Sequence, residues 1–178
     1  MKISTGIVGT NNLSYLSIAL NFVIELNVNT YLFRSNYEVN IEEKEGILKE
    51  CQDEDIERIV NFYNYSIGAP KERLTGYIGG LIEKGEIFSF EKGDEIIGTC
   101  EVRKSTTAPA VADIGMVVSP DYRRKGYGTY LLYKAKTIAL KWERIPICSC
   151  EKGNAGSVKS IHNCGFVSRY QLLSISFN

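Results

Sequence analysis

Residues 122–129 form a short, basic, glycine-containing segment whose composition suits the binding of phosphate. The segment reads Tyr-Arg-Arg-Lys-Gly-Tyr-Gly-Thr. Its glycines, Gly126 and Gly128, let the backbone turn so that several N–H groups point at one spot. A helix that begins there adds its partial positive charge, and Arg123, Arg124 and Lys125 add charge of the same sign. The segment predicts a phosphate-binding turn, although a surface turn with solvated cations would contain the same residues.

The neighbouring elements would hold this turn at the end of a strand. Apolar residues predict a strand over 111–118, and a helical pattern runs from the turn to about Trp142. A strand at 145–150 and a helix over 154–163 follow, and Gly165-Phe166 leads into another strand. The alternation of strands and helices favours an α/β domain.

The ordered set of residues 118–128, Asn154 and Gly165-Phe166 resembles the GCN5-related N-acetyltransferase (GNAT) family. The resemblance covers about residues 47–178 and is most specific over 111–166. It implies a GNAT-like α/β fold with a mixed, largely antiparallel sheet flanked by helices. In that fold the strand before the turn splays from the next one, here 145–150. The implied co-substrate is acetyl-CoA, with no metal.

The resemblance also implies which residues contact acetyl-CoA. The pantetheine arm would lie along the strand that ends at Val118, and the turn would hold the pyrophosphate. A backbone N–H near Met116 or Val117 would face the thioester carbonyl, and one such donor is typically worth about 3 kcal/mol. The predicted cofactor-binding residues are Met116, Val117, Val118, Arg123, Arg124, Lys125, Gly126, Tyr127, Gly128, Thr129 and Asn154.

Acetylation of an amine needs a group that takes a proton. An amine with a pKa of about 10.4 is almost entirely protonated at neutral pH. Asp113 is the first candidate because it shares a strand face with Gly115 and Val117, and Glu101 on the preceding strand is the second. For each carboxylate, a solvated or salt-bridged position on a strand is an equally good interpretation.

The chain departs from the family pattern at Ile161. Many members place a tyrosine there, which donates a proton to the leaving sulfur, and isoleucine cannot donate. His162 is adjacent but points about 100° away on a helix, so a surface or helix-end position suits it better. A thiolate can leave without a strong acid because the thiol pKa is near 8.5. Ser157 and Ser160 remain candidate polar neighbours of the cofactor.

The predicted function is acetyl-CoA-dependent N-acetylation of a primary amine on a small molecule or peptide. No cysteine lies beside a histidine in a recognised pattern, so direct attack in a ternary complex is expected, without an acyl-enzyme. One alternative is a CoA-binding sensor or regulatory module without efficient acyl transfer, which the isoleucine at position 161 favours. A second alternative is a structural or interaction domain that acts through its N-terminal strand-helix-strand unit. In that case the turn would be only a retained feature of the fold.

Residues 1–45 predict a strand-helix-strand extension, and residues 46–178 the acetyltransferase domain. The extension would contain a strand at 3–8, a helix at 12–26 and a strand at 29–33, joined to the domain by the polar segment 38–46. An apolar stripe supports the helix, formed by Leu13, Leu16, Leu20, Val23 and Ile24. So short a unit must dock on the rest of the chain or on another subunit.

The remaining elements follow from periodicity and turn residues. A strand at 47–51 precedes an Asp-Glu-Asp cap and a helix to about Tyr65, and a second helix covers 71–84. Strands at 87–91 and 95–103 form a hairpin around Gly93, and two strands are expected to flank Tyr170. The resemblance implies that part of the acceptor pocket lies between the first helices, near Asn61, Phe62, Tyr63, Asn64 and Tyr65, although core and rim packing explains most of these residues. Trp142 is expected to pack the end of the long helix.

Composition excludes several classes of partner. Lys plus Arg equals Asp plus Glu at 21 each, so no overall electrostatic field that would attract nucleic acid or a membrane is expected.

The five cysteines lack a C-x-x-C spacing and read as reduced, buried thiols of a cytoplasmic protein. A metal site at Cys148, Cys150, His162 and Cys164 is a minor alternative. The apolar residues 172–177 could pair across a homodimer.

Overall fold

The computed structural model describes residues 4–11, 14, 17 and 23–177, and it groups the chain into two compact units. The larger unit runs from Glu38 to Ile147. The smaller unit combines the residues up to Tyr37 with those from Cys148 onward. The C-terminal segment therefore packs with the N-terminal one, an arrangement that the order of the sequence does not indicate.

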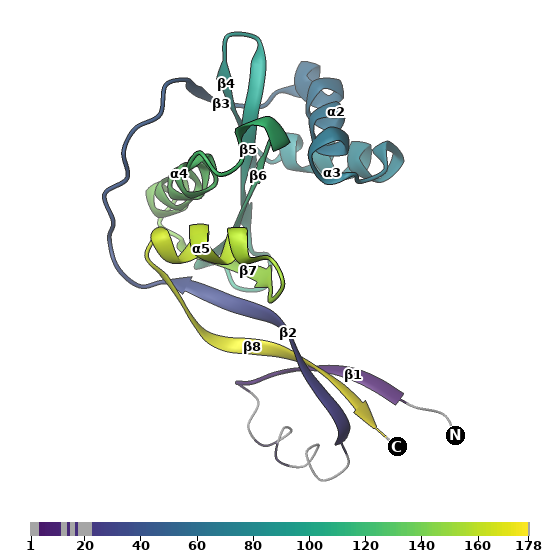
Figure 1. The fold of residues 1–178 in the computed structure, drawn as a ribbon. Helices are drawn as coiled ribbons and strands as arrows, with labels where there is room; N and C mark the ends of the chain where they lie inside the picture. The colour runs from purple at the N-terminus through teal and green to yellow at the C-terminus, as the bar shows by residue number, and fades with distance from the viewer. Residues whose placement is uncertain (1–3, 12–13, 15–16, 18–22, 178) are drawn as a thin grey trace. The chain divides into compact units, whose positions relative to one another are not determined.

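The larger unit is built on a mixed sheet. Strands β3 (Ile47–Glu50), β4 (Ile87–Lys92), β5 (Glu95–Lys104) and β6 (Val111–Val118) pair in that order, each antiparallel to the next. Strand β7 (Ile145–Glu151) begins in this unit and pairs with β6 in parallel. The predicted mixed, largely antiparallel sheet is confirmed, as is the hairpin of β4 and β5 around Gly93 (Figure 1).

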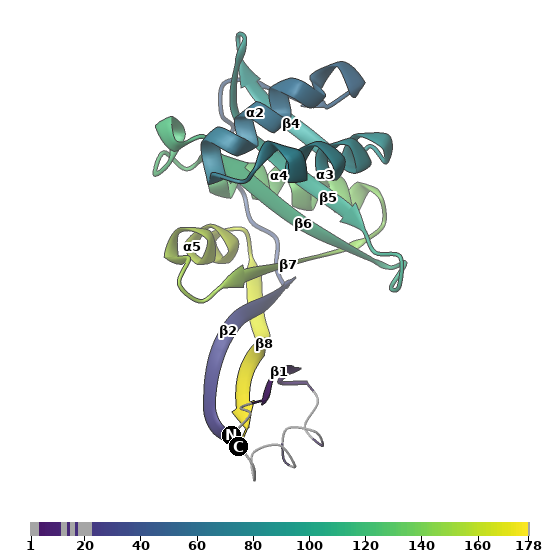
Figure 2. The same ribbon diagram turned by 90° about the vertical axis from the view of Figure 1, so that its right-hand side faces the viewer.

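Helices cover both faces of this sheet. Helices α2 (Ile56–Ile67) and α3 (Lys71–Glu83) lie on one face, and α4 (Tyr127–Lys141) lies on the other (Figures 1 and 2). Apolar residues of α2 recur at helical spacing and are buried, and the helix ends at Gly68, whose φ of 69° suits glycine. The core under α2 and α3 contains Cys51, Ile59, Val60, Phe62, Tyr63, Leu74, Ile78, Leu81, Ile82 and Ile87.

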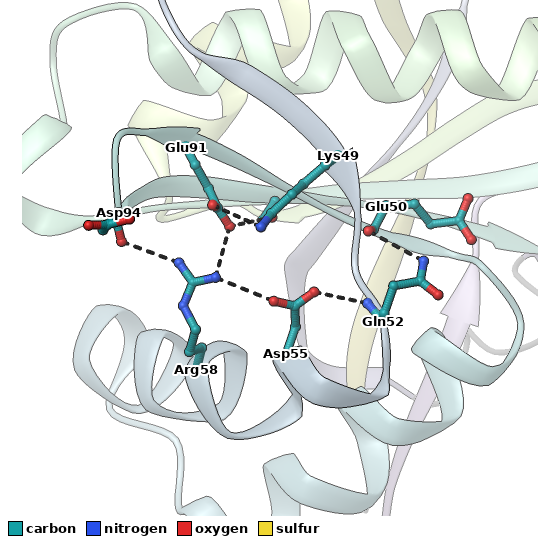
Figure 3. Close-up of polar contacts among 8 residues, drawn as sticks. Lys49, Glu50, Gln52, Asp55, Arg58, Glu91 and Asp94 are labelled. Atoms are coloured by element: carbon teal, nitrogen blue, oxygen red, sulfur yellow. Dashed lines mark hydrogen bonds and ion pairs between the residues drawn. The ribbon is translucent and has the colours of Figure 1, made fainter.

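Charged side chains tie the start of α2 to strands β3 and β4 (Figure 3). Glu91 is only 8% exposed and accepts a hydrogen bond from the Ser89 hydroxyl at 2.8 Å. Its carboxylate also pairs with the Lys49 ammonium at 3.1 Å and the Arg58 guanidinium at 3.4 Å. Arg58 in turn binds Asp55 at 3.3 Å, in the 3-10 turn η1 (Asp53–Asp55) that leads into α2. The network contains two carboxylates and two cations.

The smaller unit is dominated by one long strand. Strand β8 (Phe166–Phe177) lies between β1 (Ser4–Gly9) and β2 (Val23–Ser35) and is antiparallel to both. Helix α5 (Ala155–Asn163) precedes it. Both edges of β8 are paired over residues 172–177. The homodimer stays a prediction, and it would need a surface other than an edge of this strand.

The helix predicted over residues 12–26 is wrong at its C-terminal end. Ser14 and Ser17 are helical, whereas Val23 and Ile24 are the first residues of β2. The other members of the predicted stripe, at positions 13, 16 and 20, lie outside the described residues. From Ile24 to Val28 apolar and polar residues alternate, which also fits a strand, and pairing with β8 selects that conformation.

The two strands predicted to flank Tyr170 are a single strand. Leu32 pairs with Tyr170 and Phe33 with Ser168, so Arg169 is bypassed in the register between β2 and β8. The expected break between two strands is therefore a β-bulge within β8. The domain boundary at residue 45 stays a prediction, because the two compact units do not test which segment folds alone.

Candidate active site

The glycine turn lies between the end of β6 and the start of α4. After β6 comes a 3-10 turn, η2 (Pro120–Tyr122), and then Arg124 and Gly126 both adopt positive φ, 60° and 84°. The first bond of the helix is donated by the Tyr130 amide to the Gly126 carbonyl at 3.1 Å. The amides at the start of a helix have no acceptor within it, so this end of α4 has the geometry of an anion site.

Two of the three cations of the turn bind carbonyl groups of the protein. Arg123 donates to the Ser66 carbonyl at the end of α2 at 2.5 Å and to the Val118 carbonyl at 3.3 Å. Lys125 donates to the Asp121 carbonyl at 2.9 Å. Arg124 is exposed. Arg123 and Lys125 therefore stabilise the conformation of the turn, and their predicted contact with phosphate stays a prediction.

Strand β6 has an edge that β7 covers only in part. The parallel pairing with β7 runs from Val111 to Asp113, whereas β6 continues to Val118. The Ser119 amide donates to β5, at the Ile97 carbonyl, and the Ala110 carbonyl accepts from Ile145 of β7. Backbone groups alternate in direction along a strand, so even-numbered residues of β6 face the β7 side.

This alternation refines the expected backbone contact with a thioester. Met116 and Val118 direct their N–H and C=O groups toward the edge that β7 leaves, and Val117 directs its own toward β5. The geometry favours Met116 over Val117 as the backbone donor. The β6–β7 pairing ends at Asp113 and Ile147, and the splay of the two strands expected from the resemblance stays a prediction.

Glu101 is a buried carboxylate on the face of the sheet covered by α2 and α3. It is 5% exposed and accepts hydrogen bonds from the hydroxyls of Tyr63 at 2.6 Å and Tyr77 at 2.5 Å, and it also pairs with Arg103. Tyr63 accepts in turn from Thr99 at 3.0 Å. All of the polar atoms that contact this carboxylate are donors, which fixes its orientation.

Burial and the negative charge of Glu101 keep the surrounding tyrosines protonated. Burial first, and then the neighbouring carboxylate, raise the pKa of Tyr77 to about 12 and hold the pKa of Tyr63 well above its usual value. Burial alone would lower the pKa of Arg103, but the charges of Glu101 and Asp113 outweigh it and raise that pKa. Arg103 therefore stays a cation.

Asp113 lies at the rim of the same cluster. Its carboxylate pairs with Arg103 at 2.8 Å, and its side chain is 43% exposed. Glu101 and Asp113 thus share one guanidinium, so the cluster carries one excess negative charge. A side chain at Gly115 would lie 3.7 Å from Arg103 and 3.9 Å from Glu101. The glycine leaves room beside both charged groups.

Sequence reasoning missed Tyr77 and Arg103, although each left a signal. Tyr77 follows Leu74 by three positions and lies beside the buried stripe of α3, where it is 43% exposed, and a phenol at the edge of such a stripe can donate to a polar partner. Arg103 follows Glu101 by two positions, so the two side chains share a face of β5. Neither signal identifies the partner without the fold.

The other residues expected near an acceptor have varied roles. Phe62 and Tyr63 belong to the core, and Tyr65 is exposed, with its hydroxyl 2.9 Å from Asp121. Asn64 donates to the Ala69 carbonyl at 2.9 Å, beyond the end of α2. Trp142 packs against Phe88 at the end of α4, as expected.

The predicted residues of the smaller unit have structural roles that the sequence indicates. Asn154 caps α5, because its side-chain oxygen accepts from the Ser157 amide at 3.1 Å. Ile161 is buried, and the His162 ring packs edge-on against Phe33, with 5.4 Å between centroids. The contact of Asn154 with the cofactor stays a prediction.

The described residues contain neither a metal-binding cluster nor a membrane-spanning helix. Within residues 4–11, 14, 17 and 23–177, no cluster of three or more His, Cys, Asp or Glu side chains has the arrangement of a metal site. Among the helices in this described part of the chain, none has the length and apolar character needed to span a bilayer.

Comparisons with known proteins agree with the geometry. The model of the acetyltransferase (GNAT) family matches residues 51–166. A GNAT-family acetyltransferase from Colwellia psychrerythraea has a TM-score of 0.93 and 27% identity, over 98% of this chain and 65% of that one. A GCN5-related N-acetyltransferase from Sphaerobacter thermophilus has a TM-score of 0.72 and 13% identity, over 98% and 59%. This chain thus spans less than two thirds of either protein.

The structure of yncA from Salmonella typhimurium with its cofactor acetyl-CoA is also similar. Its TM-score is 0.59 at 16% identity, over 75% of this chain and 92% of that one. No curated protein matches the sequence. A mixed sheet with an early end to the β6–β7 pairing and a glycine turn before α4 defines an acyltransferase fold. The chain belongs to the acetyltransferase (GNAT) family, which confirms the predicted family and fold.

Proposed function

We propose that the protein is an acetyl-CoA-dependent N-acetyltransferase that acts on a primary amine. The supporting observation is the edge of β6 that extends past its pairing with β7 and ends at the glycine turn of α4. A backbone edge suits the amide groups of pantetheine, and the turn suits a diphosphate. The described residues therefore fit acetyl-CoA, which supplies the activated acetyl group.

In the proposed reaction the amine attacks the thioester carbon directly. The C–N bond forms, the C–S bond breaks, and the sulfur leaves with the electron pair and is protonated by water. The Met116 N–H would donate to the carbonyl oxygen as negative charge develops there. No covalent enzyme intermediate is needed.

Glu101 is the carboxylate that we propose takes the amine proton, through a water molecule. It is buried and held by three donors, whereas Asp113 is partly exposed. The excess negative charge that Glu101 and Asp113 share would also attract the ammonium form of the acceptor. The proposed setting is the cytoplasm, because all five cysteines are buried thiols.

A substitution at Gly126 tests the binding of acetyl-CoA. Gly126→Asp places a side chain and an anion at a φ of 84°, where the turn must approach phosphate. We expect binding of acetyl-CoA, measured by calorimetry, to be abolished. Gly93→Asp is the matched control, since Gly93 has a φ of 61° in the hairpin turn and no atom within 4 Å of an added Cβ. Unchanged affinity of the Gly126 variant would overturn the assignment of the turn.

A second candidate function is a CoA-binding sensor, which the buried Ile161 favours because it cannot protonate a leaving thiolate. Release of free CoA thiol with a panel of primary amines separates the two functions. An enzyme releases thiol in proportion to the amine consumed. A sensor binds acetyl-CoA and releases none above the rate of hydrolysis.

A further inference from the structure

Residues of the linker 38–46 are fixed to the larger unit by carboxylates on either side of Lys44. Glu43 accepts hydrogen bonds from the Tyr130 hydroxyl and the Lys134 ammonium of α4, both at 2.7 Å. The hydrogen bonds from Lys134 and Tyr130 lower the pKa of Glu43. Glu45 pairs with the Lys92 ammonium at the end of β4 at 2.6 Å. Both neighbours of Lys44 are therefore held in place.

The side chain of Lys44 lies over the glycine turn. An added Cβ at Gly126 would be 3.7 Å from the Lys44 Cε atom and 3.9 Å from its Nζ atom. The Nζ atom is also 6.0 Å from the centroid of the Tyr127 ring. Among the ion pairs of the described residues, none involves Lys44. Its ammonium group therefore remains available to an anion at the turn.

The positive charge of Lys44 is not neutralised by the acidic residues beside it in the linker. The negative charges of Glu43 and Glu45 are each paired with a lysine of another element, so neither neutralises Lys44. Within the turn, Arg123 and Lys125 donate to carbonyl groups of the protein. A segment about eighty residues earlier in the chain thus brings to the turn a cation that the motif itself does not contain.

We propose that Lys44 is a further coenzyme-binding residue, whose ammonium group contacts a phosphate of acetyl-CoA. This inference rests on the proposed function. Coenzyme A offers phosphate oxygens in its diphosphate and in its ribose 3′-phosphate, and a lysine ammonium is a compact point charge that can serve either. Dephospho-CoA lacks only the 3′-phosphate, so it distinguishes the two sources.

The test is calorimetric binding of CoA and dephospho-CoA to the full chain and to three variants. Lys44→Ala should bind CoA about tenfold more weakly, as expected for loss of one charge-assisted hydrogen bond. Lys44→Arg should recover most of the affinity. Lys84→Ala, which removes an exposed cation at the end of α3, should behave as the unchanged protein. The difference between Lys44→Ala and the unchanged protein should shrink at high salt.

Each outcome has one meaning. If Lys44→Ala weakens both ligands, Lys44 contacts the diphosphate, and if it weakens CoA alone, Lys44 contacts the 3′-phosphate. If Lys44→Ala binds both ligands as the unchanged protein does, the inference is wrong while the proposed function stands. If the unchanged protein binds neither ligand, the proposed function and this inference both fail.

Discussion

Glu91 and Glu101 are buried carboxylates near opposite ends of the β4–β5 hairpin, and their charges are compensated differently. Glu91 pairs with Lys49 and Arg58, and together with Asp55 these form a set of two anions and two cations. Glu101 and Asp113 share the single cation Arg103, with tyrosine hydroxyls as the remaining donors to Glu101. The Glu91 set, whose charges cancel, joins elements of the fold. The Glu101 set keeps one net negative charge, which could attract an amine.

The largest effect is expected on catalysis, in the cluster formed by Glu101 and Asp113. Glu101→Gln keeps the shape of the side chain but removes its charge, so kcat should fall about a hundredfold or more. Asp113→Asn should lower kcat by less than about tenfold, because this carboxylate lies at the rim of the cluster. Steady-state kinetics with the best amine acceptor measures both. A larger loss for Asp113→Asn than for Glu101→Gln would exchange their roles.

The next effect should appear in stability and leave activity unchanged. Glu91→Gln leaves Lys49 and Arg58 without their buried anion, which should lower the free energy of unfolding by about 1–3 kcal/mol. Urea denaturation followed by circular dichroism measures the loss. At a temperature where the variant is folded, its kcat should match that of the unchanged protein. A loss of kcat larger than the loss of folded protein would contradict the division between the two sites.

Tyr77 links the Glu101 cluster to the pH dependence of stability. Its pKa rises to about 12 in the folded protein from about 10 in the unfolded chain. Between these values the folded state holds a proton that the unfolded state has lost, so stability should fall as the pH rises from about 10 to 12. Thermal unfolding should show a shallower fall for Tyr77→Phe. Identical slopes would mean that this hydroxyl does not couple to folding.

The smallest effect is expected at the exposed end of the Glu91 network. The Lys49 side chain is 42% exposed, so its ion pair is largely screened, and Lys49→Ala should cost less than about 1 kcal/mol. Arg58→Ala should cost more, because Arg58 contacts Asp55 as well as Glu91. Chemical denaturation at low and high salt measures both. Equal costs would show that the contact with Asp55 adds no stability.

The sequence was informative where structure is decided locally. The turn at Gly126, the hairpin at Gly93 and the helices of the larger unit follow from glycine conformation and periodicity. Residues 23–28 fit a helix and a strand alike, and only the pairing with β8 decides between them. The sequence alone therefore could not predict this part of the smaller unit, because its conformation depends on pairing between residues far apart in the chain.

Prediction of the candidate site was limited for the same reason. Asp113 and Glu101 could be placed on neighbouring strands, but their order of importance depends on burial under α2 and α3. Tyr77 reaches Glu101 from α3, and the sequence of that helix does not identify this contact. Lys44 lies in a polar linker without a motif, and its place at Gly126 is visible only in the fold.

The contacts of Arg123 bear on the order in which substrates bind. One guanidinium joins the last turn of α2 to the end of β6, so it links the turn proposed to bind acetyl-CoA to the helix that carries Tyr63. Binding of acetyl-CoA at the turn should then fix the position of α2 on the acceptor side before the amine binds. This predicts sequential addition of substrates with acetyl-CoA first. A lysine could not span both carbonyls, so Arg123→Lys should make the order of addition random.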